Sequence, residues 1–163
     1  MKCAGTDTPE FEAPGLCCII GYGNPQRGDD GLGPWVVNQA EKAMPDRDRV
    51  FFHTCHQLLP DPVDELAWAR SVVFVDATVE ILPEGRRWEK VRPSLDVAPY
   101  ITHSVKPDYF LGLLELIYGR RPEGWLVSIQ GDDFEMGQGI SPEAKQRARR
   151  VVTELIGFVS KED

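Results

Sequence analysis

Short apolar runs alternate with longer amphipathic stretches from residue 16 onward, and this alternation predicts strands and helices in turn. The apolar runs predict strands at residues 16–21, 50–52, 72–75, 88–92 and 125–129. Stretches with helical spacing of apolar positions predict helices at residues 31–43, 61–69, 107–118 and 142–159. Strands and helices that alternate in this way predict a three-layer α/β/α sandwich.

Two local features refine this prediction. Only about ten residues separate Asp76 from Trp88, whereas a parallel crossover needs a dozen or more, so we predict that the strand at 88–92 runs antiparallel to its neighbours. The last helix has clear signals at its start. Ser141 is a good N-cap, and Pro142 suits the first helical position.

The chain is predicted to be one domain with a tail. Residues 1–14 contain two prolines and mixed polarity, and we predict that they form a flexible N-terminal tail. Residues 15–163 are predicted to form a single domain, because no repeat or low-complexity tract interrupts the alternation. With 163 residues, 42% of them hydrophobic, the chain is long enough to bury a core.

Composition and charge narrow the choice of partner. The formal net charge of −8, from 26 acidic and 18 basic residues, argues against nucleic acid or an anionic membrane as the main partner.

No apolar stretch reaches the length of a membrane span, and the N-terminus lacks the apolar core of a signal peptide, so we expect a cytoplasmic protein. The four cysteines show no CxxC spacing and are expected to be reduced thiols. No stretch indicates an obligate interface, so we expect a monomer.

The segment GYGNPQRGDDGLGPWVV, residues 21–37, joins the first predicted strand to the first predicted helix. In open α/β sheets this edge is where ligands bind. Its adjacent carboxylates, Asp29 and Asp30, suit a hard or borderline metal ion, although Asp30 taken alone fits the role of a helix N-cap slightly better. A dinucleotide-binding loop requires a third glycine where Gln26 stands, and the chain contains no Gly-Lys-Ser/Thr of a P-loop.

Asp76 repeats the placement of Asp30, because it comes directly after the predicted strand 72–75. A cap or turn residue explains either aspartate alone, but a carboxylate after a buried strand must be solvated, paired or ligating. His103 lies in a loop before the apolar helix at 107–118, where a lone histidine is more often a surface residue than a ligand. Together, Asp30, Asp76 and His103 form a two-carboxylate, one-imidazole set that suits nickel, zinc or iron and leaves coordination positions open.

A second cluster, His53, Cys55 and His56, follows the predicted strand 50–52. With a further cysteine it would make a closed zinc site, but the spacing matches no common finger pattern and no fourth ligand is apparent. A binding loop is the better interpretation. Hydrolase nucleophiles are not indicated, because there is no Gly-x-Ser-x-Gly elbow and Cys55 beside His56 makes a weak Cys–His candidate.

These motifs resemble those of the nickel–iron hydrogenase maturation proteases, endopeptidases that remove a C-terminal extension from the hydrogenase large-subunit precursor. The family carries a Gly-x-Gly-Asn run followed by an acidic pair and Gly-x-Gly, here Gly21, Gly23, Asn24, Asp29, Asp30, Gly31 and Gly33. It also carries a strand that ends in Asp-Ala, here at Asp76, and a histidine ahead of a leucine-rich helix, here His103. The resemblance spans roughly residues 16–159. It implies a five-stranded mixed sheet with one antiparallel strand.

The resemblance also implies a site and a substrate. Asp30, Asp76 and His103 would bind a nickel ion that is already inserted in the precursor, although other divalent metals also suit such ligands. Asp30 and Asp76 would be the catalytic residues, with water activated by the metal or by a carboxylate, or with the two aspartates sharing a proton. The remaining candidates are substrate-loop residues, namely Asn24, Asp29, His53, Cys55 and His56.

The sequence departs from better-known members of the family at residues 53–60, where those members have an acidic, glycine-rich turn. This segment is closer to the branch that serves cytoplasmic, NAD-coupled hydrogenases, and it is expected to help select the substrate. Two other classes of function stay open. The first is a non-catalytic, nickel-binding assembly factor that holds the precursor with the same ligands but does not cleave it. The second is a nucleotide-binding domain that uses the loop after the first strand, which the missing third glycine counts against.

Overall fold

The computed structural model describes residues 16–44, 48–59, 64–96 and 105–161. The five strands of the sheet are β1 (Cys17–Tyr22), β2 (Val50–Cys55), β3 (Ser71–Thr78), β4 (Arg86–Val91) and β5 (Glu123–Gln130). The α-helices are α1 (Leu32–Ala43), α2 (Asp64–Ala67), α3 (Pro107–Tyr118) and α4 (Pro142–Lys161). Two short 3₁₀ turns, η1 (Gly28–Gly31) and η2 (Pro83–Gly85), precede α1 and β4. The predicted N-terminal tail lies outside the described residues.

The strands form one mixed sheet in the order β2-β1-β3-β5-β4. Strands β1, β2, β3 and β5 are parallel to one another, and β4 pairs with β5 in the antiparallel direction. The predicted antiparallel strand is thereby confirmed, because the connection from β3 to β4 is too short to hold a crossover helix. The chain continues from β1 to the β2 side of the sheet and later returns to β3 on the other side of β1. The pair β1 and β3 is therefore the place where the strand order reverses.

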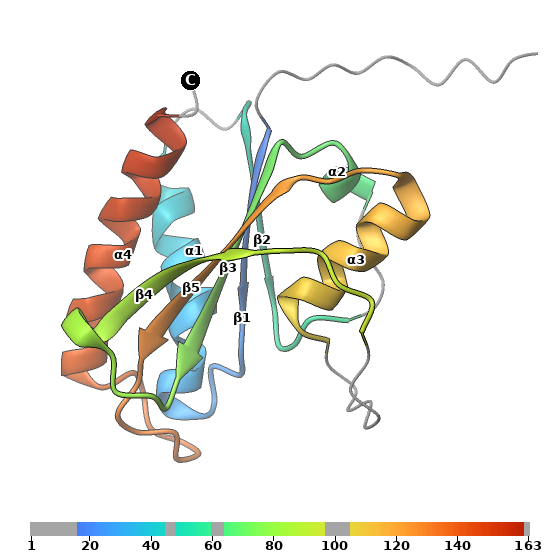
Figure 1. Cartoon of the computed structure of the whole chain (residues 1–163). Helices are drawn as coiled ribbons and strands as arrows, with labels where there is room; N and C mark the ends of the chain where they lie inside the picture. Colours follow the sequence, from blue (N-terminus) through green and yellow to red (C-terminus); the bar gives the residue numbers. More distant parts are fainter. Residues whose placement is uncertain (1–15, 45–47, 60–63, 97–104, 162–163) are drawn as a thin grey trace, which may run out of the picture.

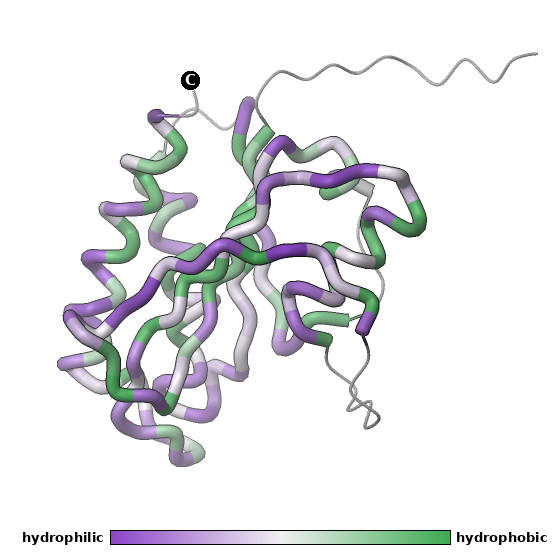
Figure 2. Tube along the Cα trace, in the orientation of Figure 1, coloured by the Kyte–Doolittle hydropathy of each residue, from purple (hydrophilic) through white to green (hydrophobic). Residues whose placement is uncertain are grey.

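Two layers of helices enclose the sheet, with α1 and α4 on one face and α2 and α3 on the other (Figure 1). Each face of the sheet has its own hydrophobic core, and alternate residues of each central strand pack into one core or the other. In β1, Cys17 and Ile19 pack with α1 and α4, whereas Cys18 and Ile20 pack with α2 and α3. Because both faces of the parallel strands are buried, their sequences are continuous apolar runs, and Figure 2 shows these runs as hydrophobic central strands. The predicted three-layer α/β/α sandwich is confirmed.

Close packing of α1 against the sheet depends on Gly33 in the first turn of the helix. A Cβ atom at this position would lie 2.4 Å from the carbonyl oxygen of Val75 and 2.7 Å from that of Tyr22. Both contacts are with backbone atoms, which a side-chain rotation cannot relieve. The glycine therefore lets α1 begin directly beside the carboxyl ends of β1 and β3.

The structure corrects the bounds of several predicted elements. Strands β4 and β5 each begin two residues earlier than predicted. Strand β2 continues to Cys55 rather than ending at residue 52, because it keeps pairing with β1 as far as Tyr22. Strand β3 continues to Thr78, because its last residues pair with β5. The helix predicted at 61–69 is described only as the single turn α2. In the described part of the chain, no helix is both long enough and apolar enough to cross a membrane.

Candidate functional site

The carboxyl edge of the sheet, where β1 and β3 end side by side, brings two of the predicted site residues together. Asp30 lies in η1, which follows β1, and Asp76 lies near the end of β3. The register pairs Gly21 with Val75, so the next residues, Tyr22 and Asp76, lie at the same level of the sheet. This is the position at which ligands bind in open α/β sheets.

Asp30 is held by the loop that precedes it. The backbone N–H of Asn24 donates a hydrogen bond to Oδ2 of Asp30 at 2.7 Å. The N-cap of α1 is Gly31 and not Asp30, and it makes no side-chain capping bond, so the structure rules out the capping role that Asp30 had as an alternative. Gly23 makes this tight loop possible for two reasons. Its φ of 140° is a backbone conformation that residues with a side chain rarely adopt, and a Cβ atom there would lie 1.9 Å from the carbonyl oxygen of Asp30.

Asp76 is a carboxyl group kept close to its titration point at neutral pH. Burial, together with the charge of Asp30, raises the pKa of Asp76 to about 7. Hydrogen bonds from the backbone N–H of Ala77 and from the hydroxyl of Tyr22 oppose this rise by stabilising the carboxylate. Burial and the neighbouring charge of Asp76 in turn raise the pKa of Tyr22, which keeps the phenol protonated and able to donate. Asp76 can therefore accept or release a proton near pH 7, as a general base or acid must.

Asp29 has a different role from its neighbour, because its side chain is fully buried. Its Oδ2 accepts hydrogen bonds from the backbone N–H of Asp132 at 2.7 Å and of Asp133 at 3.0 Å, and from the hydroxyl of Ser141 at 2.7 Å. Its Oδ1 accepts from the backbone N–H of Ser141 at 2.6 Å. Burial alone would raise the pKa of Asp29, but these hydrogen bonds hold it below its usual value. Asp29 thus fastens the loop between β5 and α4 to η1.

The members of the second cluster, His53, Cys55 and His56, lie in different elements, because β2 continues to Cys55. His53 and Cys55 lie in the strand, His53 stacks on Phe51 with ring centroids 6.2 Å apart, and His56 is exposed beyond the end of the strand. Within the described residues, no group of three histidine, cysteine or acidic side chains is arranged to hold a metal ion. His53, Cys55 and His56 all belong to the described part, so they do not form the closed zinc site considered from the sequence.

The third predicted ligand, His103, lies outside the described residues. The donors that the structure does place, the carboxylates of Asp30 and Asp76, are oxygen ligands of the kind that divalent cations accept. The two negative charges repel each other at this sheet edge, and a cation between or beside the carboxylates would relieve that repulsion.

Tyr22 is a part of the site that the sequence did not indicate. It is the last residue of β1, and its alternation with Cys18 and Ile20 puts it on the α3 face, the same face as Phe74 and Asp76. That periodicity was present in the sequence, but the pairing of β1 with β3 was needed to bring the phenol to the carboxyl group. Ser141 lies directly before α4, as predicted for its N-cap, and its hydroxyl donates to Asp29.

The fold and site together define a class: an α/β/α sandwich with a pair of carboxylates at the switch point of a mixed sheet. No protein-family model matches the chain, and no curated protein matches it. Solved structures do match. A [NiFe] hydrogenase maturation protease HycI from Thermococcus kodakarensis is 25% identical, with a TM-score of 0.70 over 93% of this chain and 96% of the other.

Two further structures agree with this result. A hydrogenase 2 maturation peptidase from a Thaumarchaeota archaeon is 20% identical, with a TM-score of 0.65 over 89% of this chain and 98% of its own. The hydrogenase maturating endopeptidase HybD from E. coli is 18% identical, with a TM-score of 0.63 over 90% and 93% of the two chains. At these lower identities the likeness concerns the fold. The Thermococcus match, at 25% identity over nearly the whole of both chains, supports the resemblance to the hydrogenase maturation proteases that the motifs predicted.

Proposed function

We propose that the protein is an endopeptidase that removes the C-terminal extension of a nickel–iron hydrogenase large-subunit precursor. The likeness to solved structures supports the reaction class, since the structures that match are named as maturation proteases, peptidases or endopeptidases. The observation that carries the proposal within this chain is the juxtaposition of Asp30 and Asp76 at the switch point, with Asp76 titrating near pH 7. Peptide hydrolysis requires a group that takes a proton from water at neutral pH, and Asp76 is such a group.

Each residue then has a distinct task. Ionised Asp76 takes a proton from the attacking water, and the Tyr22 hydroxyl fixes the orientation of that carboxylate. Asp30, held by the N–H of Asn24, provides the second carboxylate. An aspartic-type arrangement, in which Asp30 and Asp76 share one proton, uses the same two residues and the same neighbouring charges.

The nickel ion in this proposal belongs to the substrate. We propose that Asp30, Asp76 and His103 complete the coordination of nickel already inserted in the precursor, and so position the cleaved bond at the sheet edge. Support comes from the donor types and from the mutual repulsion of the two carboxylates, which a cation relieves. A precursor without metal lacks this link and is expected to remain uncut.

Intact mass spectrometry of a nickel-loaded large-subunit precursor, before and after incubation with the protein, tests this function. Loss of one discrete C-terminal peptide from the nickel-loaded sample, but not from a metal-free sample, is the expected result. The Asp76→Asn variant should leave the precursor intact, whereas Asp96→Asn, at an exposed position of the described chain, should cut it normally. Nickel-dependent binding of a cognate precursor without any change in mass would instead indicate a non-catalytic assembly factor.

We also infer that the protein acts as a monomer in the cytoplasm and serves an NAD-coupled hydrogenase. The departure at residues 53–60 supports the choice of hydrogenase. Sedimentation of the purified protein, fractionation of the cells that make it, and cleavage assays against precursors of different hydrogenase classes test its three parts separately.

A further inference from the structure

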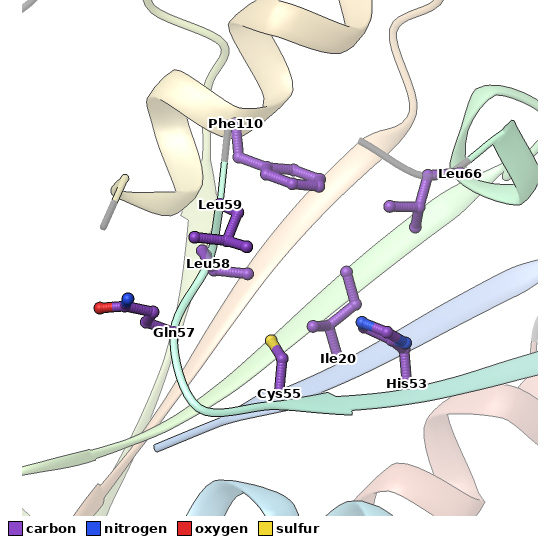
Figure 3. Close-up of a pocket in the computed structure, with 8 residues that line it drawn as sticks. All are labelled: Ile20, His53, Cys55, Gln57, Leu58, Leu59, Leu66 and Phe110. Atoms are coloured by element: carbon purple, nitrogen blue, oxygen red, sulfur yellow. The ribbon is translucent and has the colours of Figure 1, made fainter. Parts of the chain in front are cut away.

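A small, mostly apolar pocket lies near the end of β2, on the face of the sheet that α2 and α3 cover. Its volume is about 200 Å³. Figure 3 shows Ile20, His53 and Cys55 on the strands at one side of the pocket, and Phe110 and Leu66 on the helices at the other. Leu58 and Leu59, in the segment after β2, complete the apolar part of the lining.

The pocket and the carboxylate site share one row of the sheet. Cys55, which lines the pocket, is the register partner of Tyr22, and Tyr22 donates a hydrogen bond to Asp76. Cys55 lies on β2 and Asp76 on β3, with only β1 between them, so the two are two strand spacings apart, about 10 Å. An extended peptide advances about 3.3 Å per residue, so this distance corresponds to about three residues.

The size and chemistry of the pocket define what it can hold. A cavity of about 150 Å³ lined by apolar side chains takes up a benzene ring, so a pocket of this size accommodates a side chain such as leucine, methionine or phenylalanine. An ionised side chain would lose its hydration among Ile20, Leu66 and Phe110. The polar members of the lining are His53 and Gln57, and among the described residues the lining includes no lysine, arginine or carboxylate to pair with such a charge. Burial raises the pKa of the Cys55 thiol, so this residue adds no negative charge to the wall.

We propose that this pocket is a specificity subsite that receives an apolar side chain of the precursor, about three residues along the peptide from the bond that is cut. The inference rests on the proposed function and deepens it, because it names the part of the substrate that residues 53–59 select. Cys55, Tyr22 and Asp76 form one row across the sheet. A peptide bound over the carboxylates can therefore reach the pocket along this row. A peptide bound there crosses β1 and enters the pocket at the end of β2.

Single aspartate substitutions in the nickel-loaded precursor test the subsite. Aspartate is placed in turn at each of the four residues on either side of the cleaved bond, and kcat/KM is measured by mass spectrometry. We expect one position, about three residues from the bond, at which aspartate lowers kcat/KM at least roughly tenfold through a raised KM. Leucine, methionine and phenylalanine at the same position should all be accepted.

A variant of the enzyme with a positive charge at the pocket completes the test. Leu59 lines the pocket and is 52% exposed, so Leu59→Arg offers a guanidinium at its mouth without disturbing the core. This variant should recover cleavage of the sensitive aspartate precursor and cut the natural precursor less well. Leu116→Arg is the matched control, since Leu116 is 68% exposed on α3 and does not line the pocket. The control should behave as the wild type with both substrates.

The outcomes separate the two proposals. Cleavage of the natural precursor with equal tolerance of aspartate at every position would overturn the subsite and leave the protease function standing. The subsite is likewise overturned, and the protease function retained, if Leu59→Arg and Leu116→Arg behave alike. No cleavage of the natural nickel-loaded precursor by the wild-type protein would overturn the protease function and the subsite together.

Discussion

Changing each of the two adjacent aspartates, Asp29 and Asp30, to asparagine should impair different properties of the protein. Asp29 is fully buried and accepts four hydrogen bonds from Asp132, Asp133 and Ser141. Asp30 is partly exposed, and the structure gives it one backbone donor, the N–H of Asn24. Asp29→Asn should therefore reduce stability, and Asp30→Asn should reduce cleavage.

The size of the stability loss follows from these hydrogen bonds. An asparagine at position 29 keeps one oxygen, so it loses at least the bond from the N–H of Ser141 and turns its own NH₂ towards that buried donor. An unsatisfied buried donor costs about 1–3 kcal/mol, and each remaining bond loses the part due to the charge, about 0.5–1 kcal/mol. With three remaining bonds, the total loss for Asp29→Asn should be about 2.5–6 kcal/mol. Asp30→Asn keeps an acceptor for its one bond and should cost less than about 1 kcal/mol.

The pH dependence of stability gives a second signature of Asp29. Because the folded structure lowers the pKa of this carboxyl, its stabilising effect is fully present above the unfolded value of about 3.9 and is lost as pH falls through the folded value. The difference in unfolding free energy between the wild type and Asp29→Asn should therefore be constant from pH 8 to about 5 and shrink at lower pH.

Urea unfolding followed by circular dichroism measures both effects, with the three proteins compared at pH 7 and along a pH series. Cleavage of the nickel-loaded precursor is then assayed below the unfolding transition of each variant. Equal stability of Asp29→Asn and wild type at pH 7 would refute the structural role of Asp29. A loss in Asp30→Asn as large as that in Asp29→Asn would refute the division of tasks between the two residues.

Three further outcomes are expected. Tyr22→Phe removes the hydrogen bond that lowers the pKa of Asp76, so the acid limb of the pH–rate profile for cleavage should move to higher pH; an unchanged profile would contradict this. Asp76→Asn should unfold at higher urea than the wild type at pH 8, and the gap should narrow as pH falls from about 7 towards 4, because protonation removes the buried charge. Glu154→Ala should lower stability by about 1–3 kcal/mol with cleavage intact, since Glu154 joins α4 to Arg86 and Trp88 of β4; unchanged thermal unfolding would count against it.

The sequence allowed the fold to be predicted because local patterns and the sheet agree. The continuous apolar runs of β1 and β3 correspond to strands buried on both faces, and the short connection before β4 correctly predicted its direction. The placement of Asp30 and Asp76 at one edge was also predictable, because both follow apolar runs of parallel strands.

Other features depended on pairing between distant segments. The end of β2 could not be placed at Cys55 from residues 53–55 alone, since the polar side chains there continue the ladder only because β1 supplies the partners. The burial of Asp29 depends on a loop more than a hundred residues further along the chain, at Asp132 to Ser141. The pocket also joins separate elements, and neither Leu66 nor Phe110 shows a local signal that it faces Cys55.

The electrostatics of the carboxylate pair give a physical reason for cleavage to depend on the metal in the precursor. In the free protein the charge of Asp30 and the burial of Asp76 both oppose ionisation of Asp76, so the base needed for hydrolysis is largely suppressed below neutral pH. If the precursor brings a divalent cation to this pair, as proposed, the dominant charge near Asp76 becomes positive. Such a cation would stabilise both carboxylates and draw the substrate to them in the same step. A precursor without nickel would provide neither effect, so it would meet a site that binds it weakly and a base that is only partly ionised at neutral pH. Recognition and activation would then depend on one ion, the same ion that would relieve the repulsion between the two aspartates at the sheet edge.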